Sequence, residues 1–128
     1  MYSPAEVARR YVETGKSKAA LPVGRMLLLG MLAGAFIALA GGSATFAVSY
    51  GGGLAGAAVF PAGLAMVLLA GSELFTGSCL LVIPLLERQL TWGRMRRSWG
   101  VVYLANVLGA GSVAALTVAA GTFDGVYE

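Results

Sequence analysis

Three long stretches of the chain carry almost no charge, and they constrain the fold more than any other feature. Residues 26–48 and 99–120 contain no charged side chain, and residues 50–86 contain only that of Glu73. At about 1.5 Å of rise per helical residue, about 20 apolar residues cross the roughly 30 Å hydrocarbon core of a bilayer. The sequence therefore predicts an all-α membrane protein with three transmembrane segments, at about 26–48, 53–86 and 99–120.

The middle stretch is too long for one crossing and too short for two crossings joined by a turn. We interpret it as one span interrupted by a loop near residues 72–78, where Glu73, Thr76 and Ser78 cluster. Irregular backbone is tolerated at membrane depth only where protein or a water-filled cavity satisfies its polar groups, so a broken span indicates a pathway or a buried site. The alternative is an overlong helix that is kinked by glycine and Pro84.

The basic residues predict the topology. All nine lie in two segments, one before the first span and one before the last: Arg9, Arg10, Lys16, Lys18 and Arg25, then Arg88, Arg94, Arg96 and Arg97. By the positive-inside rule both segments are cytoplasmic. The expected location is the cytoplasmic (inner) membrane, with several crossings and a cytoplasmic N-terminus. We attribute the basic clusters to topology and predict no nucleic-acid partner.

The chain is expected to divide into a cytoplasmic segment, residues 1–25, and a transmembrane repeat, residues 26–128. Ser3 and Glu6 have the spacing of a capping box, with Pro4 at the first helical position. A short amphipathic helix should start there, run to about Thr14 and stop at Gly15. Its apolar face suits the membrane interface.

The composition excludes most catalytic chemistry. There is no histidine and only one cysteine, Cys79, which we interpret as a packing residue. The usual zinc and haem sites and Cys/His nucleophile pairs cannot be built from this chain. We therefore expect no metal site, no cofactor and no enzymatic activity.

Small residues recur at four-residue spacing in the first and last spans. They are Gly30, Gly34, Ala38 and Gly42, then Ala105 and Gly109, and Gly111, Ala115 and Ala119. Such stripes let helix backbones approach closely. Asn106, in the last span, is interpreted as a helix-to-helix hydrogen-bond donor rather than a substrate ligand. Three spans cannot surround a pathway by themselves, so oligomerisation or a second half is expected.

Four blocks of sequence carry a family resemblance. They are FPAGL at 60–64, AGSELFTG at 70–77, LTWG at 90–93 and WGVVYLANVLGA at 99–110. Together they closely resemble the formate/nitrite transporter family. The resemblance covers nearly the whole chain and matches the N-terminal half of that family, its first three-helix repeat.

The resemblance implies a homopentamer whose protomers each have an aquaporin-like pore, built from six helices as two inverted three-helix repeats. Members move small monovalent anions such as formate or nitrite through the lipid bilayer, often with a proton. By motif match, Phe60 and Leu64 would form the outer constriction and Leu74 would help form the inner one. Phe75 lies on the same interrupting loop, and Thr76 would be a polar contact near the pore centre.

Three further residues, Glu73, Gly77 and Ser78, are expected to structure the loop. A carboxylate within an apolar span is also a candidate for proton exchange with the pathway. We favour the structural role, in which Glu73 accepts hydrogen bonds from loop amides or pairs with a neighbouring helix. The reason is that the pore-facing member of the motif should be Thr76.

The chain departs from the family in length and in histidine content. Members are about twice as long, in line with inverted-repeat construction. The histidine that the resemblance connects with substrate protonation lies on the second broken helix. The predicted function is thus a channel or transporter for small monovalent anions, linked to protons and incomplete without a second repeat, which a partner chain could carry. The alternative is an inert truncated fragment or a non-transporting membrane assembly partner.

Overall fold

Every regular element within residues 1–126, the part of the chain that this computed structural model describes, is a helix. Two stretches of these residues are long and apolar enough to cross a membrane, Val23–Ala70 and Trp92–Ala119. A shorter apolar stretch covers Phe75–Leu86. The predicted all-helical class is confirmed, whereas the count of three crossings stays a prediction.

The first helix, α1 (Pro4–Ala19), begins where the capping box predicts. The Ser3 hydroxyl accepts a hydrogen bond from the Glu6 amide, and the Glu6 carboxylate accepts one from the Ser3 amide. The predicted end near Thr14 is wrong, because Gly15 lies buried inside the helix. A Cβ atom at Gly15 would lie 2.9 Å from the Pro84 side chain, so this glycine permits close packing and does not stop the helix.

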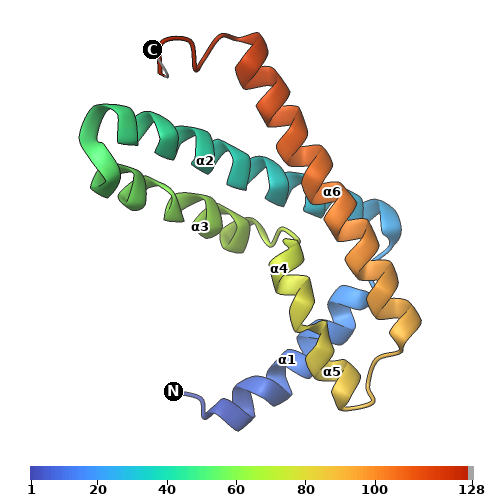
Figure 1. Cartoon of the computed structure of the whole chain (residues 1–128). Coiled ribbons are helices and arrows are strands. Elements are labelled where there is room, and N and C mark those ends of the chain that lie inside the picture. Colours follow the sequence, from blue (N-terminus) through green and yellow to red (C-terminus); the bar gives the residue numbers. More distant parts are fainter. Residues whose placement is uncertain (127–128) are drawn as a thin grey trace.

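Helices α2 (Val23–Val59) and α3 (Pro61–Ala70) form an antiparallel hairpin, drawn in cyan and green in Figure 1. The chain reverses inside α2 at Gly52, whose φ of 77° and ψ of −176° belong to a region that glycine alone enters readily. The returning limb packs tightly, since a Cβ atom at Gly63 would lie 2.5 Å from that of Ala40. The first helical limb therefore extends past the predicted end at Val48.

The predicted interruption of the middle stretch is present. Helix α3 is closed by Gly71 in the left-handed conformation, with φ of 64°. Three short elements follow: α4 (Phe75–Ser78), the 3-10 helix η1 (Cys79–Leu81) and α5 (Val82–Leu86). Residues 71–74 are non-helical, so the break is shorter than the predicted 72–78, and the alternative of a continuous kinked helix is wrong.

The last helix, α6 (Trp92–Ala119), crosses α2 (Figure 1). It begins earlier than the predicted Trp99 because the Thr91 hydroxyl accepts a hydrogen bond from the Arg94 amide and caps it. Ala19, Leu81, Leu90 and Met95 form a small buried cluster where α1, η1 and the start of α6 meet. In Figure 1, α1 and the C-terminal end of α6 lie at opposite ends of the molecule.

Candidate functional site

The break between α3 and α4 is held by hydrogen bonds from two long helices. The Glu73 amide donates to the Leu29 carbonyl of α2 at 3.2 Å. The Asn106 side chain of α6 accepts from the Phe75 amide at 2.8 Å and donates to the Glu73 carbonyl at 2.9 Å. The helix-to-helix role predicted for Asn106 is confirmed by a further bond, from its Nδ2 to the Gly30 carbonyl of α2 at 2.7 Å.

The short helix α4 is anchored at its other end by aromatic side chains. The Trp99 indole donates to the Ser78 carbonyl at 2.7 Å, and the Tyr11 hydroxyl donates to the Gly77 carbonyl at 3.1 Å. Burial, and secondly the negative charge of Glu73, raise the pKa of Tyr11 above its usual value, so the phenol keeps the proton that it donates.

The side chain of Glu73 is buried and points to α1. Its Oε2 lies 3.8 Å from Nζ of Lys18, and about a third of the Lys18 side chain is exposed. Pairing with a neighbouring helix is one of the two alternative contacts in the structural interpretation of Glu73. The proton-exchange alternative is not tested by this contact.

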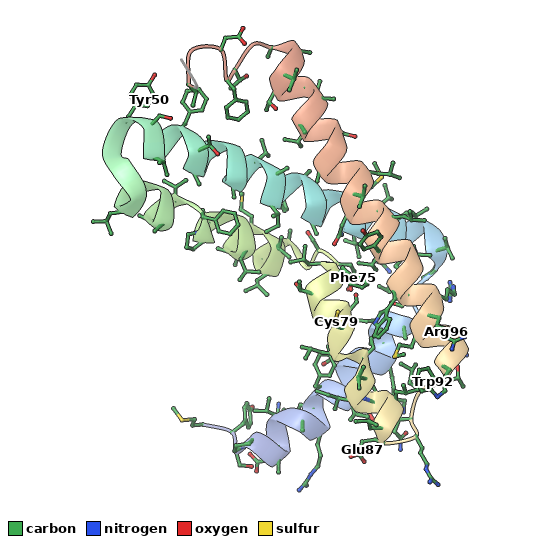
Figure 2. All side chains as sticks on the ribbon, viewed as in Figure 1. Tyr50, Phe75, Cys79, Glu87, Trp92 and Arg96 are labelled. Atoms are coloured by element: carbon green, nitrogen blue, oxygen red, sulfur yellow. The ribbon has the colours of Figure 1, made fainter. Side chains whose placement is uncertain are left out.

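Leu74 and Phe75 line an apolar groove of about 270 Å³ between α2, the break and α6. The groove is completed by Gly34, Ile37, Tyr103, Asn106, Val107 and Ala110. The Phe75 ring meets Trp99 and Tyr103 edge-on, with centroids 6.2 and 5.4 Å apart, and Figure 2 shows it at the start of α4 facing α6. The groove is open to its surroundings.

The other predicted pathway residues do not line this groove. Phe60, between α2 and α3, and Leu64, on α3, are each about half exposed, at 48% and 49%. Thr76 is exposed on α4. Phe60, Leu64 and Thr76 therefore lie outside the groove that Leu74 and Phe75 line, and their place on a pathway stays a prediction.

Sequence reasoning missed the contribution of α1 to the site. Tyr11, Gly15 and Ala19 share one helical face, and that face packs on α4, η1 and α5 through the contacts given above. The sequence predicts that the apolar face of this helix suits the membrane interface, and it gives no sign of the contacts with α4, η1 and α5. The contribution of Trp99, whose indole binds the Ser78 carbonyl, was missed as well.

The two basic segments meet at one end of the molecule. The Arg97 guanidinium, near the start of α6, donates to the Leu21 carbonyl ahead of α2 at 3.2 Å. Lys16 of α1 donates to the Gln89 side chain at 3.4 Å. The cationic side chains of both segments thus belong to the same side of the protein, as the topology prediction requires.

An all-helical membrane protein built around a discontinuous helix is the class that this fold and site define. The family model described as Formate/nitrite transporter matches residues 5–128. The chain therefore belongs to the formate/nitrite transporter family, which confirms the prediction from sequence.

Characterised and uncharacterised relatives agree with this assignment. The chain is 40% identical over 115 residues to the uncharacterized transporter YrhG of Bacillus subtilis, covering 84% of this chain and 43% of the relative. It is 37% identical to a probable formate transporter of Methanothermobacter thermautotrophicus, covering 93% and 47%. It is 31% identical to the formate channel FocA of Escherichia coli K12, covering 84% and 40%. The chain thus spans less than half the length of each relative.

Proposed function

We propose that this chain forms the N-terminal half of a pathway for small monovalent anions of the formate and nitrite class across the cytoplasmic membrane. Family membership and the similarity to relatives named as formate channels and transporters support the proposal. The observation that carries it is the discontinuous helix, in which non-helical residues 71–74 lie between the apolar helices α3 and α4. Transporters use such breaks to bring backbone polar groups to a substrate site.

Two apolar constrictions act as the charge filter in this proposal. Phe60 and Leu64 form the outer constriction, Leu74 and Phe75 form the inner one, and Thr76 offers a polar contact between them. An anion that enters a dry apolar constriction loses its hydration at a large cost in free energy, whereas the neutral acid loses far less. Transport is therefore linked to protonation of the substrate between the constrictions.

A second set of three helices, in inverted orientation, completes the pathway. The exposure of Phe60, Leu64 and Thr76 supports a missing wall, as does the length of the relatives. We place the protonating group on that second half, which belongs to the remainder of a longer protein or to a partner chain. The complete unit is an aquaporin-like six-helix fold that assembles as a homopentamer.

The proposed orientation has the N-terminus in the cytoplasm. The contacts between the basic segments at Leu21 and Gln89 support one shared cytoplasmic side. The positions of α1 and the end of α6 at opposite ends of the molecule suit an odd number of crossings (Figure 1). A tag fused ahead of Ser3 tests the orientation. It should react only with a reagent that has access to the cytoplasmic side of the membrane.

The experiment is flux into liposomes that contain this chain co-expressed with a matching second three-helix repeat, beside liposomes that contain the chain alone. We expect formate and nitrite uptake only in the first sample, accelerated by an inward proton gradient, with no uptake of divalent sulfate. Thr76→Val should slow uptake, whereas Ser112→Ala, whose hydroxyl bonds only to its own helix in the described structure, should not. No uptake in either sample would favour the alternative, an inert fragment or a non-transporting assembly partner.

A further inference from the structure

The helices α2 and α6 cross at a distance that only small residues allow. A Cβ atom at Gly34 would collide with the Asn106 carbonyl and lie 2.9 Å from the Asn106 Cα atom. One at Gly30 would lie 2.6 Å from the Ala105 Cβ atom, and one at Gly109 would collide with the Met31 backbone. The backbone of Asn106 is therefore pressed against α2, so its short side chain reaches past that helix to the break.

Two hydrogen bonds of the Asn106 side chain lie on either side of one residue of the break, Leu74. Its Oδ1 accepts from the Phe75 amide and its Nδ2 donates to the Glu73 carbonyl, at 2.8 and 2.9 Å. These two groups belong to the residues on either side of Leu74, which is extended, with φ of −98° and ψ of 137°. One side-chain amide thus pairs with the backbone around Leu74 as the N–H and C=O of one residue in a neighbouring parallel strand would.

A third bond connects this pairing to α2. The second Nδ2 hydrogen of Asn106 goes to the Gly30 carbonyl at 2.7 Å. One acceptor site and both donor hydrogens of the side chain are in use, and a reversed amide would place Oδ1 against two carbonyls. The orientation is therefore determined by its partners, and neither leucine nor aspartate can reproduce it.

We propose that Asn106 is the positioning residue of the inner constriction: by holding the backbone on both sides of Leu74, it sets where the Leu74 side chain lies. This inference rests on the proposed function only in treating Leu74 as a pathway residue. Asn106 lines the same apolar groove as Leu74 and Phe75, but it acts through the backbone of the break and not by binding the anion.

The first test measures the position of residue 74 directly. Leu74→Cys is placed in a Cys79→Ser background, and its labelling by a membrane-impermeant thiol reagent is followed in membranes that contain the full chain. Asn106→Leu and Asn106→Asp should each raise the labelling rate about tenfold, because buried hydrogen bonds to the break are lost. Leu69→Cys, on α3 and outside the reach of Asn106, is the matched control site and should label at an unchanged rate.

Aspartate keeps the size and one acceptor oxygen of asparagine and replaces the two donor hydrogens with a second carboxylate oxygen, so the control site at residue 69 separates local displacement from misfolding. An unchanged rate at residue 74 in both Asn106 variants, with the control rate also unchanged, would overturn the inference. Equal acceleration at residues 69 and 74 would overturn it as well, because that result describes general unfolding.

The second test is selectivity in the complete transporter. Asn106→Asp should lower the ratio of formate uptake to uptake of a larger monocarboxylate such as lactate about tenfold, because a displaced Leu74 no longer excludes the larger anion. A loss of folded protein alone would reduce both fluxes and leave their ratio unchanged, which would contradict the positioning role. Faster labelling at residue 74, with no flux even from the unsubstituted protein, would support the positioning role and contradict the proposed function.

Discussion

The α2–α6 crossing and the break between α3 and α4 lie side by side, yet they are held together in opposite ways. At the crossing, Gly30, Gly34 and Gly109 remove side chains so that two helix backbones touch. At the break, backbone groups are bound by polar groups of other helices. The Asn106 side chain binds the Glu73 carbonyl and the Phe75 amide, and the Leu29 carbonyl binds the Glu73 amide. One region depends on the absence of atoms, and the other depends on a few polar atoms in fixed positions.

This contrast explains how irregular backbone is tolerated at membrane depth in this chain. Lipid offers no hydrogen-bond partners, so the partners of the break come from α1, α2 and α6. A side chain as short as that of Asn106 can serve only because the glycines bring α6 so near. The tight crossing is thus the precondition for the ordered break, and damage to it should have the larger effect.

The largest expected effect comes from widening the crossing. Gly34→Ala places a methyl group against the backbone of Asn106, which cannot move aside as a flexible side chain would. We expect a loss of more than about 3 kcal/mol, at the upper end for overpacking, seen as loss of folded protein in a detergent melting assay. Gly111→Ala, on α6 but with open space at its Cβ position, is the control and should melt like the unsubstituted chain.

A smaller effect is expected from breaking the ion pair of the break. Lys18→Met leaves the buried Glu73 carboxylate without its partner, whereas Glu73→Gln removes the buried charge itself. Lys18→Met should therefore lower the free energy of unfolding by about 2 kcal/mol. This is less than the loss on breaking a fully buried ion pair, because Lys18 is partly exposed. Glu73→Gln should lower it by less. Chemical unfolding in detergent measures both. Loss of flux in Glu73→Gln at unchanged stability would contradict the structural role and favour proton exchange.

The helices, their close crossing and the existence of the break could be predicted from the sequence. The uncharged stretches predicted the helices. The four-residue spacing of Gly30 and Gly34, and of Ala105 and Gly109, predicted close packing. The length of the middle stretch and its lone Glu73 predicted the break. These predictions succeeded because hydropathy and residue size act locally and leave periodic traces.

The partners of the break were not predictable in the same way. Tyr11 and Trp99 reach Gly77 and Ser78 across 66 and 21 positions of sequence, and no periodic pattern encodes such a pairing. The limits of the break were also missed, because Phe75 becomes helical once Asn106 accepts its amide. Gly15 has the form of a helix stop, and only the neighbouring Pro84 explains why it lies within α1.

A still smaller loss of stability is expected when the Trp99 indole, which binds the end of α4, is replaced. Trp99→Phe keeps an aromatic ring beside Phe75 but removes the donor to the Ser78 carbonyl. The expected loss is about 1 kcal/mol, as for one buried hydrogen bond, in the same unfolding assay. Trp92→Phe is the matched control, because Trp92 is mostly exposed. Equal losses in the two variants would show that the bond to Ser78 contributes nothing specific to the break.

The smallest effect is expected from Tyr11, and it should depend on pH. Tyr11→Phe removes the donor to the Gly77 carbonyl and should cost about 0.5 kcal/mol at neutral pH. Because the folded protein raises the pKa of Tyr11 above its usual 10.0, the contribution is complete below about pH 10 and is lost as the pH rises through the higher folded value. The difference in unfolding free energy between the unsubstituted chain and Tyr11→Phe should therefore be constant from pH 7 to about 9 and shrink above about 10. A difference that stays constant above about pH 10 would contradict the contribution of the Tyr11 phenol to the site.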